Sequence, residues 1–291
     1  MQPNTIPVFL LAVALGLPGM AAAETSALSF SLTDLDRSKI DDDEEGLTEP
    51  SGLALSQARD ALWTVSDDTK KVFKLGLDGK LAKDQSFKIG EKGLEGIALD
   101  PTGDSLLVVK EEGNEILTIS IASEEVVSRH SLSDMAGFGE IAQHFSGGGA
   151  NKGLEGITVN RDTGTIFVLK EGEPGLLIEI SKDLGSILAA RVLDATNGFI
   201  DDDVDGPEID FSGIEYDDTR SLFWIVSDKA RRLFLYDWDR NRVIQSAALG
   251  YAKDGEFREI EKAEGVAVDP QSHRLYVVSD KEARLYVFDI R

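Results

Sequence analysis

The sequence contains no cysteine, so neither a disulfide framework nor a zinc site with thiolate ligands can hold the protein together. Basic residues are also scarce: 30 Lys and Arg stand against 53 Asp and Glu, giving a formal net charge of −23 at pH 7. So acidic a chain repels nucleic acid and anionic lipid and favours cations or basic partners. The composition argues against a nucleic-acid-binding function and leaves apolar burial to stabilise the fold.

Long apolar runs are confined to the N-terminus. The run Ile6–Leu17 is followed by Ala21–Ala23 and then Glu24, a pattern typical of a secretory signal peptide with an A-x-A cleavage site. We therefore expect a signal peptide over 1–23, a single mature domain over 24–291, and a periplasmic or secreted protein. Because no Lys or Arg precedes the run, an inner-membrane anchor formed by an uncleaved N-terminal segment is the alternative. Membrane association, either peripheral or through such an anchor, therefore stays open.

The sequence does contain a repeat that occurs five times. Each copy opens with a glycine and a short apolar strand, passes through a polar turn into a β-branched and aromatic strand, and reaches a third, alternating strand. The opening glycines are Gly52, Gly96, Gly156, Gly213 and Gly265. Such repeats predict an all-β protein, a five-bladed β-propeller of four-stranded sheets. The chain length would also permit six blades, but the motif count favours five.

The last repeat reaches Arg291 with only three strands, so its blade needs a fourth strand from elsewhere. The segment Ser26–Leu32 alternates polar and apolar residues and belongs to no repeat. We predict that Ala27–Leu32 pairs with Arg284–Ile290, because this pairing closes the ring and removes an exposed sheet edge.

Two positions in each repeat predict a common rim at the mouth of the propeller channel. The residue before each opening glycine and the last residue of the second strand are fifteen positions apart, and antiparallel pairing brings both to one end of the sheet. The pairs are Ser51 with Ser66, Glu95 with Lys110, Glu155 with Lys170, Ser212 with Ser227, and Glu264 with Ser279. Since a buried carboxylate needs a partner, the two Glu–Lys combinations predict ion pairs, whose role could be purely structural.

Glu264 is the exception, because it faces only a serine and most needs a metal, a proton or a ligand. The residue after the second strand is acidic in every repeat: Asp67, Glu111, Glu171, Asp228 and Asp280. We assign these five acids a structural role, since a carboxylate that begins a tight turn can accept backbone N–H bonds.

Acidic loops precede the first and fourth repeats, at 41–46 and 201–206. The second matches D-x-D-x-D-G and offers Asp201, Asp203 and Asp205 as oxygen ligands for Ca²⁺, although no helix pattern flanks it as in an EF-hand. A solvated acidic loop is the alternative. Both repeats also carry an acid two residues before their Ser-Gly, Glu49 and Asp210. Because these loops lead into the first strands of their blades, we expect them to lie near the same rim.

The repeats resemble the SdiA-regulated family, also described as YjiK-like. The resemblance is carried by EPSGLAL with TVSDD, KGLEGIALDPTGDSLLVVKEE, NKGLEGITVNRDTGTIFVLKEG, DFSGIEYDDTRSLFWIVSD and KAEGVAVDPQSHRLYVVSD, from about Glu49 onward. It implies an exported or membrane-associated β-propeller and supplies no catalytic residues. The E-G strand openings are more distantly similar to calcium-dependent lactonase propellers and esterase-like phytases, in which a channel-mouth glutamate helps to hold Ca²⁺. Glu264, Glu95 and Glu155 occupy comparable positions, but matching asparagines are not apparent.

Two functional hypotheses follow, and they leave open whether the protein is an enzyme. The first is a monomeric binding or interaction propeller that holds Ca²⁺ and takes a small molecule or basic peptide at the acidic channel mouth. The second is a calcium-dependent hydrolase of a lactone or phosphoester, with Glu264 as ligand or base. Residues 130, 144 and 273 are the three histidines, and their predicted positions on an outer strand, an insertion and a turn favour no Ser-His-Asp triad.

Overall fold

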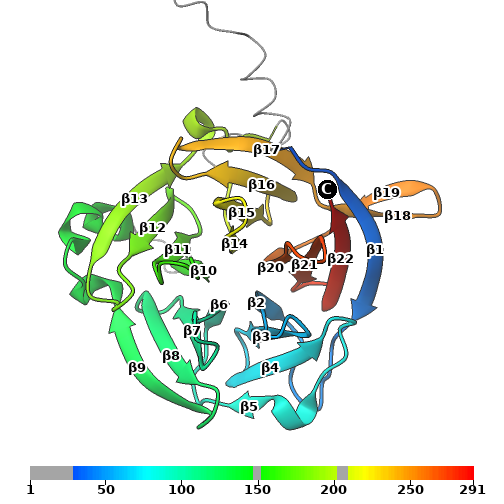
Figure 1. Ribbon diagram of the computed structural model, residues 1–291, viewed down its shortest axis with the longest axis horizontal. Helices are drawn as coiled ribbons and strands as arrows, with labels where there is room; N and C mark the ends of the chain where they lie inside the picture. The colour runs from blue at the N-terminus through cyan, green and yellow to red at the C-terminus, as the bar shows by residue number, and fades with distance from the viewer. Residues whose placement is uncertain (1–28, 147–151, 202–208) are drawn as a thin grey trace, which may run out of the picture.

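The five repeats fold into five four-stranded antiparallel sheets arranged as a ring (Figure 1). The computed structural model describes residues 29–146, 152–201 and 209–291. Blade 1 contains β2 (Pro50–Leu55), β3 (Ala61–Ser66), β4 (Lys71–Gly76) and β5 (Phe87–Lys88). Blade 2 contains β6 (Leu94–Leu99), β7 (Ser105–Lys110), β8 (Glu115–Ser120) and β9 (Glu125–Ser131). Blade 3 contains β10 (Leu154–Val159), β11 (Ile166–Lys170), β12 (Gly175–Ile180) and β13 (Ile187–Leu193).

The fourth and fifth blades complete the ring and confirm the predicted five-bladed β-propeller. Blade 4 contains β14 (Gly213–Asp217), β15 (Leu222–Ser227), β16 (Arg232–Asp237) and β17 (Arg242–Ala248). Blade 5 contains β20 (Ala263–Asp269), β21 (Arg274–Ser279), β22 (Arg284–Ile290) and, as its outer strand, β1 (Leu32–Lys39). The helices of the described ranges are short 3₁₀ turns: η1 (Lys83–Gln85), η2 (Leu132–Asp134), η3 (Phe138–Glu140), η4 (Ala142–Phe145) and η5 (Ala195–Asn197).

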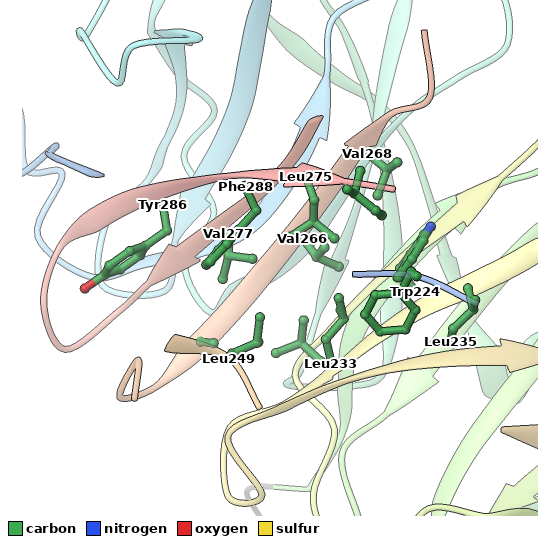
Figure 2. Packing of buried hydrophobic residues seen from close by; sticks show 14 of the residues in the cluster. Trp224, Leu233, Leu235, Leu249, Val266, Val268, Leu275, Val277, Tyr286 and Phe288 are labelled. Atoms are coloured by element: carbon green, nitrogen blue, oxygen red, sulfur yellow. The ribbon is translucent and has the colours of Figure 1, made fainter. Parts of the chain in front are cut away.

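The hydrophobic core is divided among the interfaces between blades. The inner strands are buried along nearly their whole length, because neighbouring blades cover both of their faces, whereas the outer strands β9 and β17 are largely half-buried or exposed. Figure 2 shows the cluster between blades 4 and 5, to which blade 4 contributes Trp224 and Leu235 and blade 5 contributes Val268 and Phe288. Four further clusters of this kind occupy the other interfaces, so each blade is stabilised by both neighbours.

The N-terminal strand closes the ring as predicted, but mostly through residues that follow the predicted segment. Strand β1 pairs with β22 from Leu32 opposite Ile290 to Lys39 opposite Arg284, and Ser31 exchanges two backbone hydrogen bonds with Arg291. Residues 27 and 28 of the predicted segment lie outside the described residues. The outer strand of a blade faces solvent, so most of β1 is polar, and the apolar alternation of 26–32 did not indicate its extent. Phe30 instead packs edge-on against Trp224 of blade 4, with ring centroids 4.9 Å apart.

A two-stranded hairpin, β18 (Gly250–Lys253) and β19 (Glu256–Glu259), extends outward from the ring beside blade 5 (Figure 1). Its turn is Asp254-Gly255, and both residues have positive φ, as a two-residue hairpin turn requires. Tyr251 anchors the hairpin by stacking on Tyr286. Among the described residues, no helix is long and apolar enough to cross a membrane. The predicted signal peptide lies outside the described residues, and export stays a prediction.

Candidate functional site

An acid-lined cavity of about 230 Å³ opens at the centre of the ring, where the inner strands of the blades begin. We call it the acidic cup. Its lining consists of Ser51, Asp67, Glu95, Glu111, Glu155, Glu171, Asp210, Phe211, Ser212, Asp228, Lys262, Glu264 and Asp280. Nine of these side chains are carboxylic acids and only one, Lys262, is cationic. Its ammonium lies 2.7 Å from the Asp280 carboxylate, so the positive charge in the lining is already paired.

The inner ring of the cup comprises the five residues that precede the repeat glycines: Ser51, Glu95, Glu155, Ser212 and Glu264. The glycines explain why these side chains lie so close together. A Cβ on Gly52 would come within 2.5 Å of the Ile97 nitrogen, and one on Gly265 within 2.5 Å of the Ser51 oxygen. Adjacent inner strands therefore approach backbone to backbone. Below the inner ring the five glycines leave a space of only about 10 Å³, which closes the cup at its base.

The ion pairs predicted from the spacing, Glu95 with Lys110 and Glu155 with Lys170, are not formed. Lys110 lies 3.6 Å from Glu91 instead, and the Lys170 ammonium donates to the carbonyls of Gly172 and Pro174.

The strand register explains this error. Lys110 is paired with Leu94 and Lys170 with Leu154, and a bulge follows in both strands. Since successive side chains point to opposite faces of a strand, the glutamate after each leucine turns into the cup while the lysine turns away. The two carboxylates are therefore left without a repeat-encoded cation.

The remaining residues at the ends of the second strands also lie outside the cup lining. The Ser279 hydroxyl donates to the Glu261 carbonyl at 2.6 Å, and the Ser227 hydroxyl donates to Asp210 at 3.4 Å. The Ser66 hydroxyl is buried and has no hydrogen-bond partner among the described residues. Ser227 and Ser279 thus bond to groups at the rim, and none of the three serines lines the cup.

The five acids after the second strands form an outer ring of the cup, a role that the sequence analysis missed. They are Asp67, Glu111, Glu171, Asp228 and Asp280. Their backbones hold them there: the N–H of Glu171 donates to the Gly153 carbonyl at 3.1 Å, and that of Asp280 donates to Lys262 at 3.0 Å. The Asp67 carboxylate accepts a backbone N–H bond within its own turn, from Asp68, whereas the Asp228 carboxylate accepts one from Lys262, ahead of blade 5. An acid occupies the position after the second strand in all five repeats, and this regularity is the sequence signal from which a place at the channel could have been inferred.

The acids predicted near the loops have different positions. Asp210 lines the cup and accepts the Lys229 N–H at 3.0 Å, whereas Glu49 lies in an adjoining open groove with Lys262 and Asp280. Asp201, the first residue of the predicted calcium loop, pairs with Arg232 at 3.3 Å. Asp203 and Asp205 lie outside the described residues, so calcium binding by this loop stays a prediction.

Burial and mutual repulsion make the inner ring reluctant to ionise. Burial, assisted by the nearby Asp67 charge, raises the pKa of Glu95 to about 7, although a hydrogen bond from Ser51 opposes the shift. Burial together with Glu95 and Glu264 raises the pKa of Glu155 well above its ordinary value. Burial and Asp228 do the same for the pKa of Glu264, against the opposing charge of Lys262. The cup thus holds carboxyl groups that a bound cation would stabilise in their charged form.

The sequence model of the SdiA-regulated family matches residues 34–289, nearly the whole described chain. The protein belongs to the SdiA-regulated family. Among solved structures, a glutaminyl cyclase from Myxococcus xanthus is similar over 89% of this chain and 96% of its own, with 14% identity and a TM-score of 0.59. Hydrazine synthase from Kuenenia stuttgartiensis is similar over 82% of both chains, with 13% identity and a TM-score of 0.49. At these identities the likeness to the cyclase shows the propeller fold alone.

The raised pKa of Glu95 predicts that the cation-free protein loses stability as the pH rises. The reference pKa is 4.5 and the folded value about 7, so between these pH values the folded protein holds a proton that the unfolded chain releases. Stability should therefore fall by about 3 kcal/mol between pH 4.5 and 7 on account of Glu95 alone. Chemical unfolding at pH 5 and pH 7.5 measures the difference.

Glu95→Gln should remove much of this pH dependence, because glutamine carries no ionisable group. Glu112→Gln, which alters an exposed residue, is the control and should leave the dependence unchanged. An equal loss of stability in wild type and Glu95→Gln would contradict the assignment.

Proposed function

We propose that this member of the SdiA-regulated family is an exported binding protein whose acidic cup takes a cationic ligand, with Ca²⁺ as an ion bound in or beside it. The observation that carries the proposal is the charge imbalance of the lining, with nine carboxylic acids around a single, already paired lysine. Buried carboxylates are stable only when protonated, paired or bound to a cation. A ligand that supplies positive charge would therefore gain much of its affinity from groups that are already in place.

The dimensions of the cup limit what it can hold. A volume of about 230 Å³ is smaller than the roughly 300–1,000 Å³ of sites for drug-sized ligands. The closed base also prevents a chain from threading through the channel. Suitable ligands are a metal ion, a small amine, or one lysine or arginine side chain from a basic peptide.

The calcium-dependent hydrolase is less well supported by this lining. A phosphoester dianion would meet the outer ring of carboxylates before it reached the inner ring, and like charges repel at short range. The described part of the lining contains no asparagine or histidine to bind a metal or relay a proton. The site is better suited to cation binding than to turnover of an anionic substrate.

Calorimetric titration at pH 7.5 and low salt tests the proposal with three probes: Ca²⁺, a short diamine and trilysine. We expect at least one probe to bind at a single site and to stabilise the protein, by about 2.7 kcal/mol at a hundredfold excess over its dissociation constant. A dicarboxylate should not bind. Failure of all three cationic probes would contradict the proposal.

The variant Glu95→Gln with Glu264→Gln should lose most of the binding, because it removes two inner-ring charges. Asp104→Asn with Glu125→Gln removes two exposed charges outside the cup lining and is the matched control. If both double variants weaken binding equally, the attraction comes from the overall charge of the protein rather than from the cup.

A further inference from the structure

We propose that the ligand is an amino acid or short peptide that carries both an ammonium group and a free carboxylate, and that Lys262 and Lys281 hold the carboxylate in a groove beside the cup. The inference rests on the proposed function, which it narrows to one class of ligand. The groove lies between blade 5 and the loop ahead of blade 1. Its lining consists of Thr48, Glu49, Lys262, Asp280 and Lys281.

The groove and the cup share a wall, because Lys262 and Asp280 line both of them. A ligand that lies against this pair of residues therefore reaches into both spaces. The cup, of about 230 Å³, suits a single amine side chain, whereas the groove, of about 450 Å³, lies within the range of ordinary small-molecule sites. The remainder of a ligand whose amine enters the cup thus has room in the groove.

The two spaces differ in charge. Nine acids and one lysine line the cup, whereas two acids and two lysines line the groove. One of the acids of the groove, Glu49, hydrogen-bonds to the Asp68 carboxyl group, and such a bond requires a proton between the two groups. A ligand that spans both spaces is therefore matched best by a positive charge in the cup and a single negative charge in the groove.

The two lysines belong to segments that backbone hydrogen bonds hold together. Lys262 precedes β20 and Lys281 follows β21, and the N–H of Asp280 donates to the Lys262 carbonyl at 3.0 Å. The Ser279 hydroxyl adds a bond to the Glu261 carbonyl at 2.6 Å. The backbones of both lysines are thus fixed at one end of the β20–β21 hairpin, and their long side chains can turn towards a ligand.

The present partners of the lysines leave them able to bind a carboxylate. The Lys281 ammonium is paired with Glu261, but the two side chains are 59% and 47% exposed. So exposed an ion pair contributes little, because water and salt screen it, and a carboxylate in the groove can replace Glu261. Lys262 lies 2.7 Å from Asp280, and its ammonium has three donors, so it can donate to a ligand as well.

Trilysine and trilysine amide distinguish a local carboxylate site from general attraction. The amide carries one more positive charge, so the formal net charge of −23 on the protein should favour it. We expect the opposite order. In calorimetric titrations at pH 7.5 and low salt, trilysine should bind about tenfold more tightly than its amide, because its carboxylate gains charge-assisted hydrogen bonds.

Three variants assign this preference to the groove. Lys281→Gln and Lys262→Gln should each reduce it to about twofold or less, while the amide binds at least as tightly as before, because a repelling charge is gone. Glu261→Gln should increase the preference several-fold, since the acid that competes for Lys281 is removed. Lys253→Gln, which removes an exposed lysine at the end of β18, is the matched control and should leave the preference unchanged. Thermal melts establish that each variant is folded.

Three results would overturn the inference. Equal or weaker binding of trilysine relative to its amide in the wild type would mean that no cation of the protein holds the carboxylate, while the proposed function stands. A preference that survives both Lys262→Gln and Lys281→Gln would place the carboxylate elsewhere. Binding of Ca²⁺ or the diamine without either peptide would reject an amino-acid ligand and leave the proposed function intact, whereas failure of every cationic probe would reject both.

Discussion

A chain that begins at Asp41 should melt at least roughly 10 °C below a chain that begins at Glu24, the predicted start of the mature protein. The shortened chain lacks β1, which forms the whole outer edge of blade 5 and joins the two ends of the sequence. It also lacks Phe30, which is packed between blades against Trp224 and whose backbone exchanges two hydrogen bonds with Gln245. Loss of the Phe30 and Leu32 burial alone costs about 3–5 kcal/mol, which corresponds to a shift of this size in a chain of this length.

Truncation at Ser29 is the control for this experiment. That chain keeps Phe30 and all of β1, so we expect it to melt like the longer one. Equal melting temperatures for the chains that begin at Asp41 and Glu24 would show that pairing of β1 with β22 contributes little to the stability of the ring. The exposed edge of β22 should make the Asp41 chain prone to aggregate as well.

Gly265→Ala should destabilise the protein by roughly 3 kcal/mol or more and weaken cation binding. A Cβ at this position would lie 2.5 Å from the Ser51 oxygen and 2.8 Å from the Leu53 nitrogen. These are backbone atoms of the neighbouring blade, which cannot rotate away as a side chain could. The two inner strands must separate, and overpacking of this kind costs about 1–3 kcal/mol even where the neighbours can adjust.

The same substitution should move Glu264 and Ser51 apart, because both flank the glycine contact at the base of the cup. Urea unfolding and calcium titration of Gly265→Ala measure the two effects together. Gly139→Ala is the matched control, since a Cβ there meets no atom within 4 Å and the residue has no positive φ. A Gly265→Ala protein as stable as wild type would show that the blades tolerate a wider spacing than the glycines impose.

The architecture could be predicted because each blade repeats the same local pattern. Gly-Ile-Ala-Leu at 96–99 followed by Ser-Leu-Leu-Val-Val at 105–109 specifies a hairpin through β-propensity and turn chemistry, which are local properties. Five such copies with buried inner strands leave few ways to cover the apolar faces other than a ring. The hairpin β18–β19 could have been found in the same way, since Asp254-Gly255 is a strong turn signal.

What the sequence determined by itself was the number of blades and the identity of the residues before the repeat glycines, because both follow from periodicity along the chain. Tertiary structure alone decided which way those side chains face. The pairing of Lys110 with Leu94 and the bulge beside it turn Glu95 into the cup, and a one-residue offset in register reverses every side chain. The hairpin of β10 and β11 brings Glu155 and Glu171 to the same end of blade 3. Only the packing of blade 2 on blade 3 adds Glu111 to them.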